Sequence, residues 1–129
     1  MARGSEVKQR PQIAIASLRD EKFCYLTTIG RLSGQPREIE IWFNANVNTV
    51  YLLSGGRDRS DWVRNLMRQP RISLRIVCQE FKGSARVVDA QSEEDSLARA
   101  LLVKKYQTQA RDLSNWGRSS LPIAIDIDP

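Results

Sequence analysis

Short segments in which apolar and polar residues alternate are the feature that most restricts how this chain folds. The clearest spans Arg37 to Phe43, with Ile39, Ile41 and Phe43 on one face and Glu38, Glu40 and Trp42 on the other. A period of two residues predicts a strand with one buried face and one solvated face. Such strands are typical of antiparallel sheets.

Five further segments have strand composition and are bounded by turn residues. They are Phe23 to Ile29, Val50 to Ser54, Arg71 to Cys78, Phe81 to Asp89 and Leu121 to Pro129. The stretches G-R-L-S-G-Q-P and N-A-N-V-N-T read as turns, and a third turn is expected near Gln79 and Glu80. Gly83 marks a bulge or a close backbone approach.

Three short helices are expected between or before the strands. Pro11 suits the first position of a helix carrying Ile13, Ile15 and Leu18. A second helix follows the glycine pair and contains Trp62, and a third begins at Ser92, which precedes an acidic first turn. About six strands with flanking helices predict a mainly β (α+β) fold, a small antiparallel barrel closed against exposed edges. A Rossmann fold is rejected because strands alternating with long helices are absent.

The length and composition of the chain exclude several classes of protein. The 129 residues suit a single domain, 1–129, with residues 1–9 flexible. The N-terminus lacks a signal-peptide core, and apolar runs fall short of the about 20 residues that span a bilayer, so we expect a cytoplasmic protein. Cys24 and Cys78 both read as free thiols in the core. Without histidine, a metal site and a Ser-His-Asp or Cys-His centre have little support.

The net charge of +5 raises the question of an anionic partner. Ser54 to Pro70 joins a glycine pair, Arg57, Arg59 and a helix start. Glycines that take positive φ expose backbone amides, and arginine donors match phosphate oxygens. This layout suits an anion, but it is equally that of an ordinary turn in which Ser60 or Asp61 caps the helix.

Three segments together resemble the deazaflavin-dependent nitroreductase family. They are L-T-T-I-G-R-L-S-G-Q-P-R-E-I-E-I-W-F, Y-L-L-S-G-G-R-D-R-S-D-W-V-R-N-L-M-R-Q-P-R-I-S-L-R and E-F-K-G-S-A-R-V-V, in this order over residues 23–89. That family belongs to the split β-barrel flavin and deazaflavin oxidoreductases, alongside the pyridoxamine 5′-phosphate oxidase-like proteins. The resemblance implies an FMN-binding type of split barrel with about six antiparallel strands. It also implies the reduced deazaflavin coenzyme F420 as hydride donor.

The resemblance also implies which residues hold the cofactor's phosphate and tail. Two turns would contribute to this site: Arg31, Ser33 and Arg37 from the first, and Ser54, Gly55, Gly56, Arg57 and Arg59 from the second. Trp62 and Asn65 would brace the second turn. Two departures from the family pattern concern this site. Leu32 stands where a lysine often does, and Ser60 and Asp61 precede Trp62 where a proline often does.

The resemblance assigns the hydride chemistry to the cofactor, while the protein supplies position, water exclusion and electrostatics. It identifies no catalytic side chain. Aromatic residues that are candidates for the ring or acceptor site, although such residues more often pack in a core, are Trp42, Tyr51, Tyr106 and Trp116. The expected acceptor is an electron-poor small molecule: a quinone, a nitroaromatic or an activated alkene.

Other functions stay open from the sequence alone. The shortened second turn favours FMN as an alternative cofactor, in an enzyme of the same fold. A non-catalytic module that carries a flavin or deazaflavin, or that binds nucleic acid, is a further alternative. Nucleic acid is disfavoured because the arginines cluster in a turn rather than among exposed aromatic residues on strands. A homodimer is expected only by analogy with other split barrels.

Overall fold

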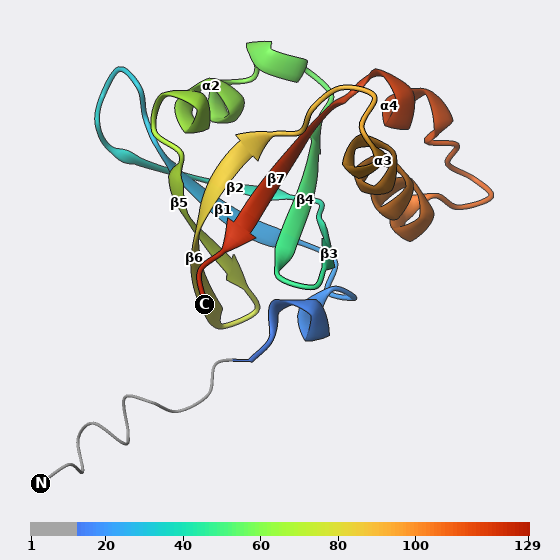
Figure 1. Cartoon of the computed structure of the whole chain (residues 1–129), viewed down its shortest axis with the longest axis horizontal. Helices are drawn as coiled ribbons and strands as arrows, with labels where there is room; N and C mark the ends of the chain where they lie inside the picture. Colours follow the sequence, from blue (N-terminus) through green and yellow to red (C-terminus); the bar gives the residue numbers. More distant parts are fainter. Residues whose placement is uncertain (1–12) are drawn as a thin grey trace, which may run out of the picture.

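The computed structural model describes residues 13–129, which form one curled antiparallel sheet flanked by helices (Figure 1). The sheet has the strand order β2-β1-β5-β6-β7-β4-β3. Its strands are β1 (Cys24–Ile29), β2 (Pro36–Ile41), β3 (Asn44–Asn46), β4 (Thr49–Ser54), β5 (Arg71–Ile76), β6 (Gln79–Val87) and β7 (Leu121–Ile127). The predicted mainly β fold of split-barrel type is therefore confirmed, with seven strands rather than six.

The additional strand is β3, in a stretch predicted to be only a turn. Asn44, Ala45 and Asn46 pair with residues of β4, so the turn itself is limited to two residues. Val47 there has a φ of 56°, a left-handed conformation unusual for a β-branched residue. Pairing with a neighbouring strand therefore outweighs the low strand propensity of asparagine.

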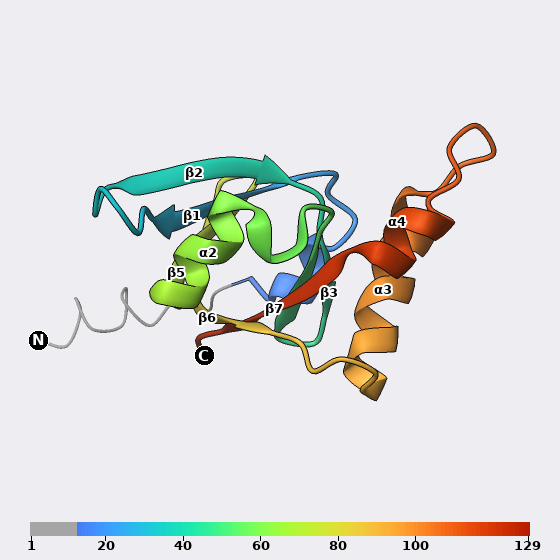
Figure 2. The ribbon, with the colours of Figure 1, turned by 90° about the horizontal axis from the view of Figure 1, so that it is seen from above.

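Helical segments lie on either side of the sheet (Figure 2). They are η1 (Ile15–Leu18), η2 (Arg57–Arg59), α2 (Asp61–Arg68), α3 (Glu93–Tyr106) and α4 (Ser114–Ser119). The predicted start of α3 is confirmed, because the Ser92 hydroxyl accepts a hydrogen bond from the Asp95 amide at 3.0 Å. The helix expected from Pro11 is reduced to the short 3-10 turn η1, and Pro11 itself lies outside the described residues. The short helix α4 was not anticipated.

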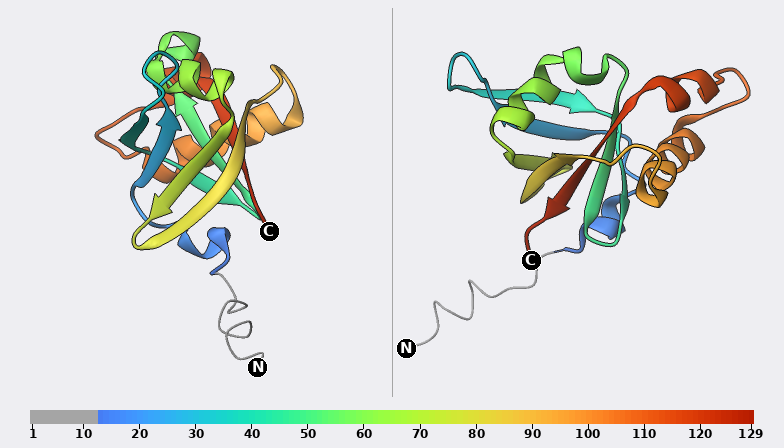
Figure 3. Two further views of the ribbon diagram at one scale, coloured as in Figure 1. Left: turned by 90° about the vertical axis from the view of Figure 1, so that its left-hand side faces the viewer. Right: turned by 45° about the horizontal axis from the view of Figure 1, so that its top comes forward.

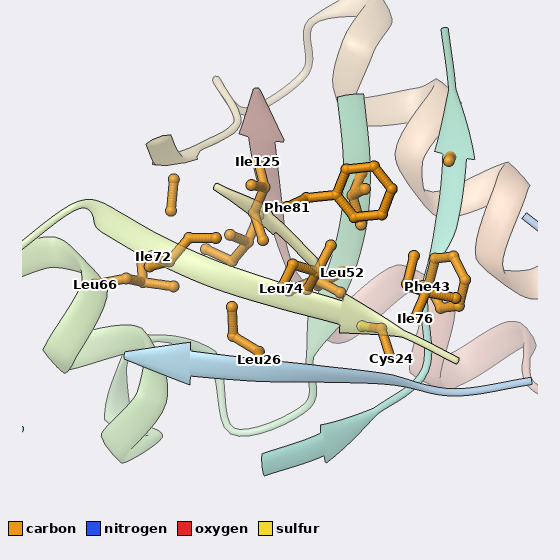
Figure 4. Packing of buried hydrophobic residues seen from close by; sticks show 14 of the residues in the cluster. Cys24, Leu26, Phe43, Leu52, Leu66, Ile72, Leu74, Ile76, Phe81 and Ile125 are labelled. Carbon is orange, nitrogen blue, oxygen red and sulfur yellow. The ribbon is translucent and has the colours of Figure 1, made fainter. Parts of the chain in front are cut away.

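The main core lies on the concave face of the sheet and includes Leu26, Phe43, Leu52, Leu74 and Ile125 (Figure 4). Each large side chain buried there contributes about 1.5–3 kcal/mol. β4 is buried on both faces, because Tyr51 and Leu53 on its other face pack under α3. This explains why β4 is a continuous apolar run rather than an alternating one.

The prediction that both cysteines lie in the core is half right. Cys24 is fully buried, and burial raises the pKa of its thiol to about 12. Cys78 is exposed, because β5 ends at Ile76 and the turn falls on Val77 and Cys78 instead of Gln79 and Glu80. At Gly83 the expected close approach is confirmed, since a Cβ there would lie 2.6 Å from the Asp126 carbonyl oxygen.

The two edge strands of the sheet, β2 and β3, are consecutive in the sequence. Only Trp42 and Phe43 connect them, so the sheet must curl until its edges meet at this corner (Figure 3). Within residues 13–129, no ladder of hydrogen bonds joins β2 to β3. The barrel is therefore joined through the corner and split elsewhere, whereas a closed barrel would have no free edges.

The last turn of α3 provides hydrogen-bonding partners for the backbone at this corner. The Tyr106 hydroxyl accepts from the Phe43 amide at 3.0 Å and donates to the Lys22 carbonyl at 2.7 Å. The Lys105 ammonium donates to the carbonyls of Glu21 and Phe43, both at 2.7 Å. The Trp42 ring stacks on Tyr106 with 4.2 Å between ring centroids. Side chains from one helix thus satisfy polar groups that neither edge strand can pair.

We predict that Tyr106→Phe lowers the free energy of unfolding by about 1–3 kcal/mol, because the buried Phe43 amide loses its acceptor. Urea unfolding followed by circular dichroism measures this change. Tyr25→Phe is the control, since the Tyr25 hydroxyl donates to Glu40 at the exposed surface, and it should cost less than about 0.5 kcal/mol. Equal effects of the two variants would contradict the role given to Tyr106.

Partial burial also predicts a pH dependence for Lys105. Desolvation lowers its pKa to about 8 from the usual 10.5, so the folded protein releases this proton at a lower pH than the unfolded chain does. Between about pH 8 and 10.5 the unfolded chain binds more protons at this group, and the contribution of Lys105 to stability rises with pH. The difference in unfolding free energy between wild type and Lys105→Met should therefore increase from pH 8 to 10. A difference independent of pH would refute this assignment.

The two thiols should differ sharply in reactivity. Because the thiolate is the reactive form, a thiol-specific disulfide reagent should modify one cysteine in the folded protein and both cysteines in denaturant. Cys78→Ser should abolish the reaction of the folded protein, whereas Cys24→Ala should leave it unchanged. Modification of two thiols under native conditions would contradict the burial of Cys24.

Candidate functional site

A pocket of about 590 Å³ lies between the loop after β1, the start of β2 and the first turns of α2. This volume is within the range of small-molecule and cofactor sites. Among the described residues, those that line it are Thr28, Gly30, Arg31, Leu32, Ser33, Pro36, Arg37, Glu38, Ile39, Asp61, Trp62 and Asn65. The elements that line the pocket meet where the β1–β2 hairpin extends beyond the rest of the sheet, and Figure 1 shows α2 beside this hairpin.

Residues 30–35 form a tight turn, and Arg31, Leu32 and Ser33 of this turn line the pocket. The Gly30 amide donates to the Gln35 carbonyl, and the Gly34 amide donates to the Gly30 carbonyl, each at 2.8 Å. Gly34 takes a φ of +73°, which glycine adopts at little cost. A Cβ at Gly30 would lie 2.6 Å from the Ser33 hydroxyl oxygen, so a larger residue there would displace the Ser33 side chain.

Asn65 fixes this loop from the buried side of α2. Its side-chain oxygen accepts from the backbone amide of Arg31 at 3.1 Å and from the Arg31 guanidinium at 3.0 Å. Its amide nitrogen donates to the buried Thr28 hydroxyl at 3.2 Å. The resemblance implied that Asn65 would brace the turn after β4, but these contacts join it to the loop after β1.

Arg37 and Ser33 complete a group of donors at the mouth of the pocket. The Arg37 guanidinium donates to the Ser33 hydroxyl at 3.2 Å, and Arg37 itself is exposed. Arg37 stands opposite Thr28 in the β1–β2 ladder, on the strand face toward α2. Two guanidinium groups and a hydroxyl beside one cavity form a donor set suited to phosphate or carboxylate oxygens.

The wall formed by α2 combines an apolar surface with a carboxylate. Trp62 is half-buried, packs against the main core and lines the pocket. Asp61 is the first residue of α2, and its carboxylate accepts from the Arg31 guanidinium at 3.2 Å. An aromatic surface beside cationic donors can hold a planar ring that carries an anionic group.

The five site residues predicted after β4 do not line this pocket. They are Ser54, Gly55, Gly56, Arg57 and Arg59. The expected positive φ is found at Arg57, with a φ of 55°, and not at either glycine of the pair. The Ser54 hydroxyl donates to the Arg57 carbonyl at 2.9 Å and stabilises this conformation.

Arg57 is turned toward the end of α4 instead of toward the pocket. Its guanidinium donates to the carbonyls of Ser119 and Ser120, at 2.9 and 3.2 Å. Arg99 of α3 donates to the same Ser120 carbonyl at 2.9 Å. Arg59 is exposed, and its guanidinium makes no hydrogen bond or ion pair within the described part of the chain. Of these two arginines, Arg59 alone has a guanidinium available to a ligand.

The remaining aromatic candidates lie apart from the pocket. Trp116 contacts the Trp42 ring edge-on, with 5.7 Å between centroids, and a Cβ at Gly55 would lie 3.6 Å from its indole nitrogen. Tyr51 donates to Glu94 under α3 at 2.7 Å. These rings hold α3 and α4 against the sheet.

Sequence reasoning did not assign Thr28, Gly30 or Asp61 to the site. Gly30 stands directly before Arg31 in the quoted segment, so its place beside a predicted site residue could have indicated that it belongs to the site. The sequence indicated Asp61 only as a helix cap and as a departure from the family pattern. Its contact with Arg31, thirty positions earlier in the chain, depends on how α2 meets the loop after β1.

Solved structures with the same fold include proteins of several functions. An F420 reductase matches at 13% identity, with 93% of this chain and 97% of that chain covered and a TM-score of 0.66. A conserved hypothetical protein from Mycobacterium tuberculosis matches at 19% identity, with 93% of this chain and 87% of that chain covered and a TM-score of 0.68. A FAD-binding protein from Mesorhizobium loti matches at 14% identity, with 87% of this chain and 85% of that chain covered and a TM-score of 0.63. These identities show a shared fold and no more.

None of the helices in residues 13–129 has the length and apolar character needed to cross a bilayer. The sequence profile described as F420H(2)-dependent quinone reductase matches residues 6–128, which is nearly the whole chain. The match includes every residue that lines the pocket. The chain therefore belongs to the F420H(2)-dependent quinone reductase family, whose members are F420-dependent oxidoreductases.

Proposed function

We propose that this protein binds F420 in the pocket beside α2 and reduces a quinone. The observation that carries the proposal is the convergence of Arg31, Ser33 and Arg37 on one cavity whose other wall contains Trp62. Family membership supplies the identity of the cofactor. The donor set and the size of the cavity both fit a ring system with a phosphate-bearing chain.

In this proposal Arg31, Ser33 and Arg37 bind the phosphate, and Trp62 provides a flat apolar surface for part of the ring or its linker. Asn65 acts through Arg31, because it holds both the backbone and the guanidinium of that residue in place. Bound F420 supplies the hydride in its reduced form. The protein's contribution is orientation and exclusion of water from the reacting face.

The acceptor is proposed to be a quinone because the family is described by that reaction. Nitroaromatics and activated alkenes are further candidates, since both accept a hydride at an electron-poor carbon or nitrogen centre. Oxidation of reduced F420, followed by its absorbance, compares the three acceptor classes directly. Turnover of a quinone above the rate without enzyme supports the proposal, and no turnover with any of the three would refute it.

We predict that Arg37→Ala raises the dissociation constant for F420 by about 10- to 100-fold, as expected for loss of a charge-assisted hydrogen bond. Fluorescence titration at low salt measures it. Arg68→Ala is the matched control, because Arg68 is an exposed arginine at the end of α2 that does not line the pocket. The control should change the constant less than about twofold.

If Arg37→Ala and Arg68→Ala weakened F420 binding equally, the effect would come from the overall charge of the protein, and this phosphate site would be rejected. A parallel titration with FMN separates the two cofactors. FMN binding without F420 binding would move the protein to the flavin enzymes of this fold.

A further inference from the structure

Asp61 places a negative charge in a pocket whose other features favour an anion. Its carboxylate is 85% exposed, lies 3.2 Å from the Arg31 guanidinium and lines the same cavity as Arg37. As the first residue of α2 it also benefits from the helix dipole. Because the side chain is open to solvent, the ion pair adds little to folding stability. Its position matters more for a ligand than for the fold.

The charges that face a ligand in this pocket are unequal in number. Four charged residues line it, namely Arg31, Arg37, Glu38 and Asp61. Glu38 stands opposite Thr27 on the other strand face, where its carboxylate pairs with Arg75 at 3.5 Å. Within the described part of the chain, two guanidinium groups and one carboxylate therefore remain toward the ligand. Their sum is a single positive charge.

A single net positive charge suits a ligand group that carries one negative charge. An anion that reaches the guanidinium of Arg31 must also approach the Asp61 carboxylate that shares it. Repulsion between the two grows in proportion to the charge on the anion. A phosphodiester carries one negative charge near neutral pH, whereas a phosphomonoester carries between one and a half and two. Asp61 therefore penalises the monoester more than the diester.

We propose, resting on the proposed function, that Asp61 is a specificity-determining residue that favours the phosphodiester of F420 over the phosphomonoester of FMN. Asp61 and Arg31 form an ion pair, so an incoming anion must compete with Asp61 for the Arg31 guanidinium. The Asp61 carboxylate repels a dianion more strongly than a monoanion. The two arginines attract either cofactor. The Asp61 carboxylate beside Arg31 sets the preference.

The test compares wild type with Asp61→Asn, which keeps the shape of the side chain and removes its charge. Dissociation constants for F420 and for FMN are measured by fluorescence at pH 7.5 and low salt. The variant should bind F420 about threefold more tightly and FMN about tenfold more tightly, as expected for removal of one nearby like charge. The preference for F420 should thus fall by about threefold. Asp61→Ser, which also suits a helix start, should give the same direction of change.

Asp58→Asn is the matched control for overall charge. Asp58 lies three residues earlier in η2, and its carboxylate makes no hydrogen bond or ion pair within residues 13–129. This variant should leave the ratio of the two dissociation constants unchanged. If Asp61→Asn left the ratio unchanged, or Asp58→Asn lowered it equally, the inference would be wrong.

Two small probes separate this inference from the proposed function. Phenyl phosphate carries the monoester charge and its methyl ester carries one charge, and calorimetry measures both without a cofactor. If the ratio of the dissociation constants of the two probes changes in Asp61→Asn and the protein does not bind F420, the role of Asp61 stands and the proposed function is rejected. Binding of F420 with an unchanged ratio would reject the role of Asp61 alone. No binding of either cofactor or either probe would reject both.

Discussion

The hydrogen bonds between the end of α3 and the backbone of Phe43 are the constraint on which the rest of the structure depends. Two residues must carry the chain from one edge of the sheet to the other, and their peptide groups have no strand beside them. Tyr106 and Lys105 supply the missing partners. Because an unpaired buried amide is costly, docking of α3 stabilises this curl of the sheet. Folding of the strands and docking of the helix are therefore linked.

Joining the sheet at one corner leaves it open at the other end, and that opening holds the pocket. β1 and β2 continue past the body of the sheet as a hairpin, and α2 lies beside their inner face (Figure 2). A fully closed barrel of this size would fill its interior with side chains. The split instead leaves a cavity with one wall of strand and loop and another of helix, which is the kind of setting in which cofactors are bound.

The sequence predicted the fold well where hydrophobic periodicity was strong. The segments predicted from alternation or from strand composition were recovered as β1, β2, β5, β6 and β7, and the short apolar segment was recovered as β4. The errors fell where pairing or turn geometry decided the outcome. Asn44 to Asn46 became a strand because β4 lies beside it, and Cys78 became exposed because the turn came two residues early. Neither effect is local, so composition alone did not reveal it.

Prediction of the site was less complete for a similar reason. Arg31, Ser33, Arg37, Trp62 and Asn65 meet at one cavity, but the predicted residues from Ser54 to Arg59 do not line it, and Arg57 turns toward α4. Identifying which loop Asn65 holds, and that Asp61 reaches Arg31, required knowing how α2 lies on the hairpin. Residue type indicated the chemistry of the site, whereas the orientation of one helix determined which groups share it.

The side chain of Asn65 has a consequence for how the hairpin and its loop are kept in register. A side-chain amide has a donor end and an acceptor end. Here the nitrogen donates to the Thr28 hydroxyl on β1, and the oxygen accepts from two nitrogens of Arg31. A symmetrical or apolar group of the same size could not distinguish a strand from a loop in this way. The hydrogen bonds of Asn65 therefore fix the orientation of the hairpin relative to α2 as well as its position. Because the buried Asn65 side chain holds both the backbone and the guanidinium of Arg31, the orientation of this cation in the pocket depends on where α2 lies.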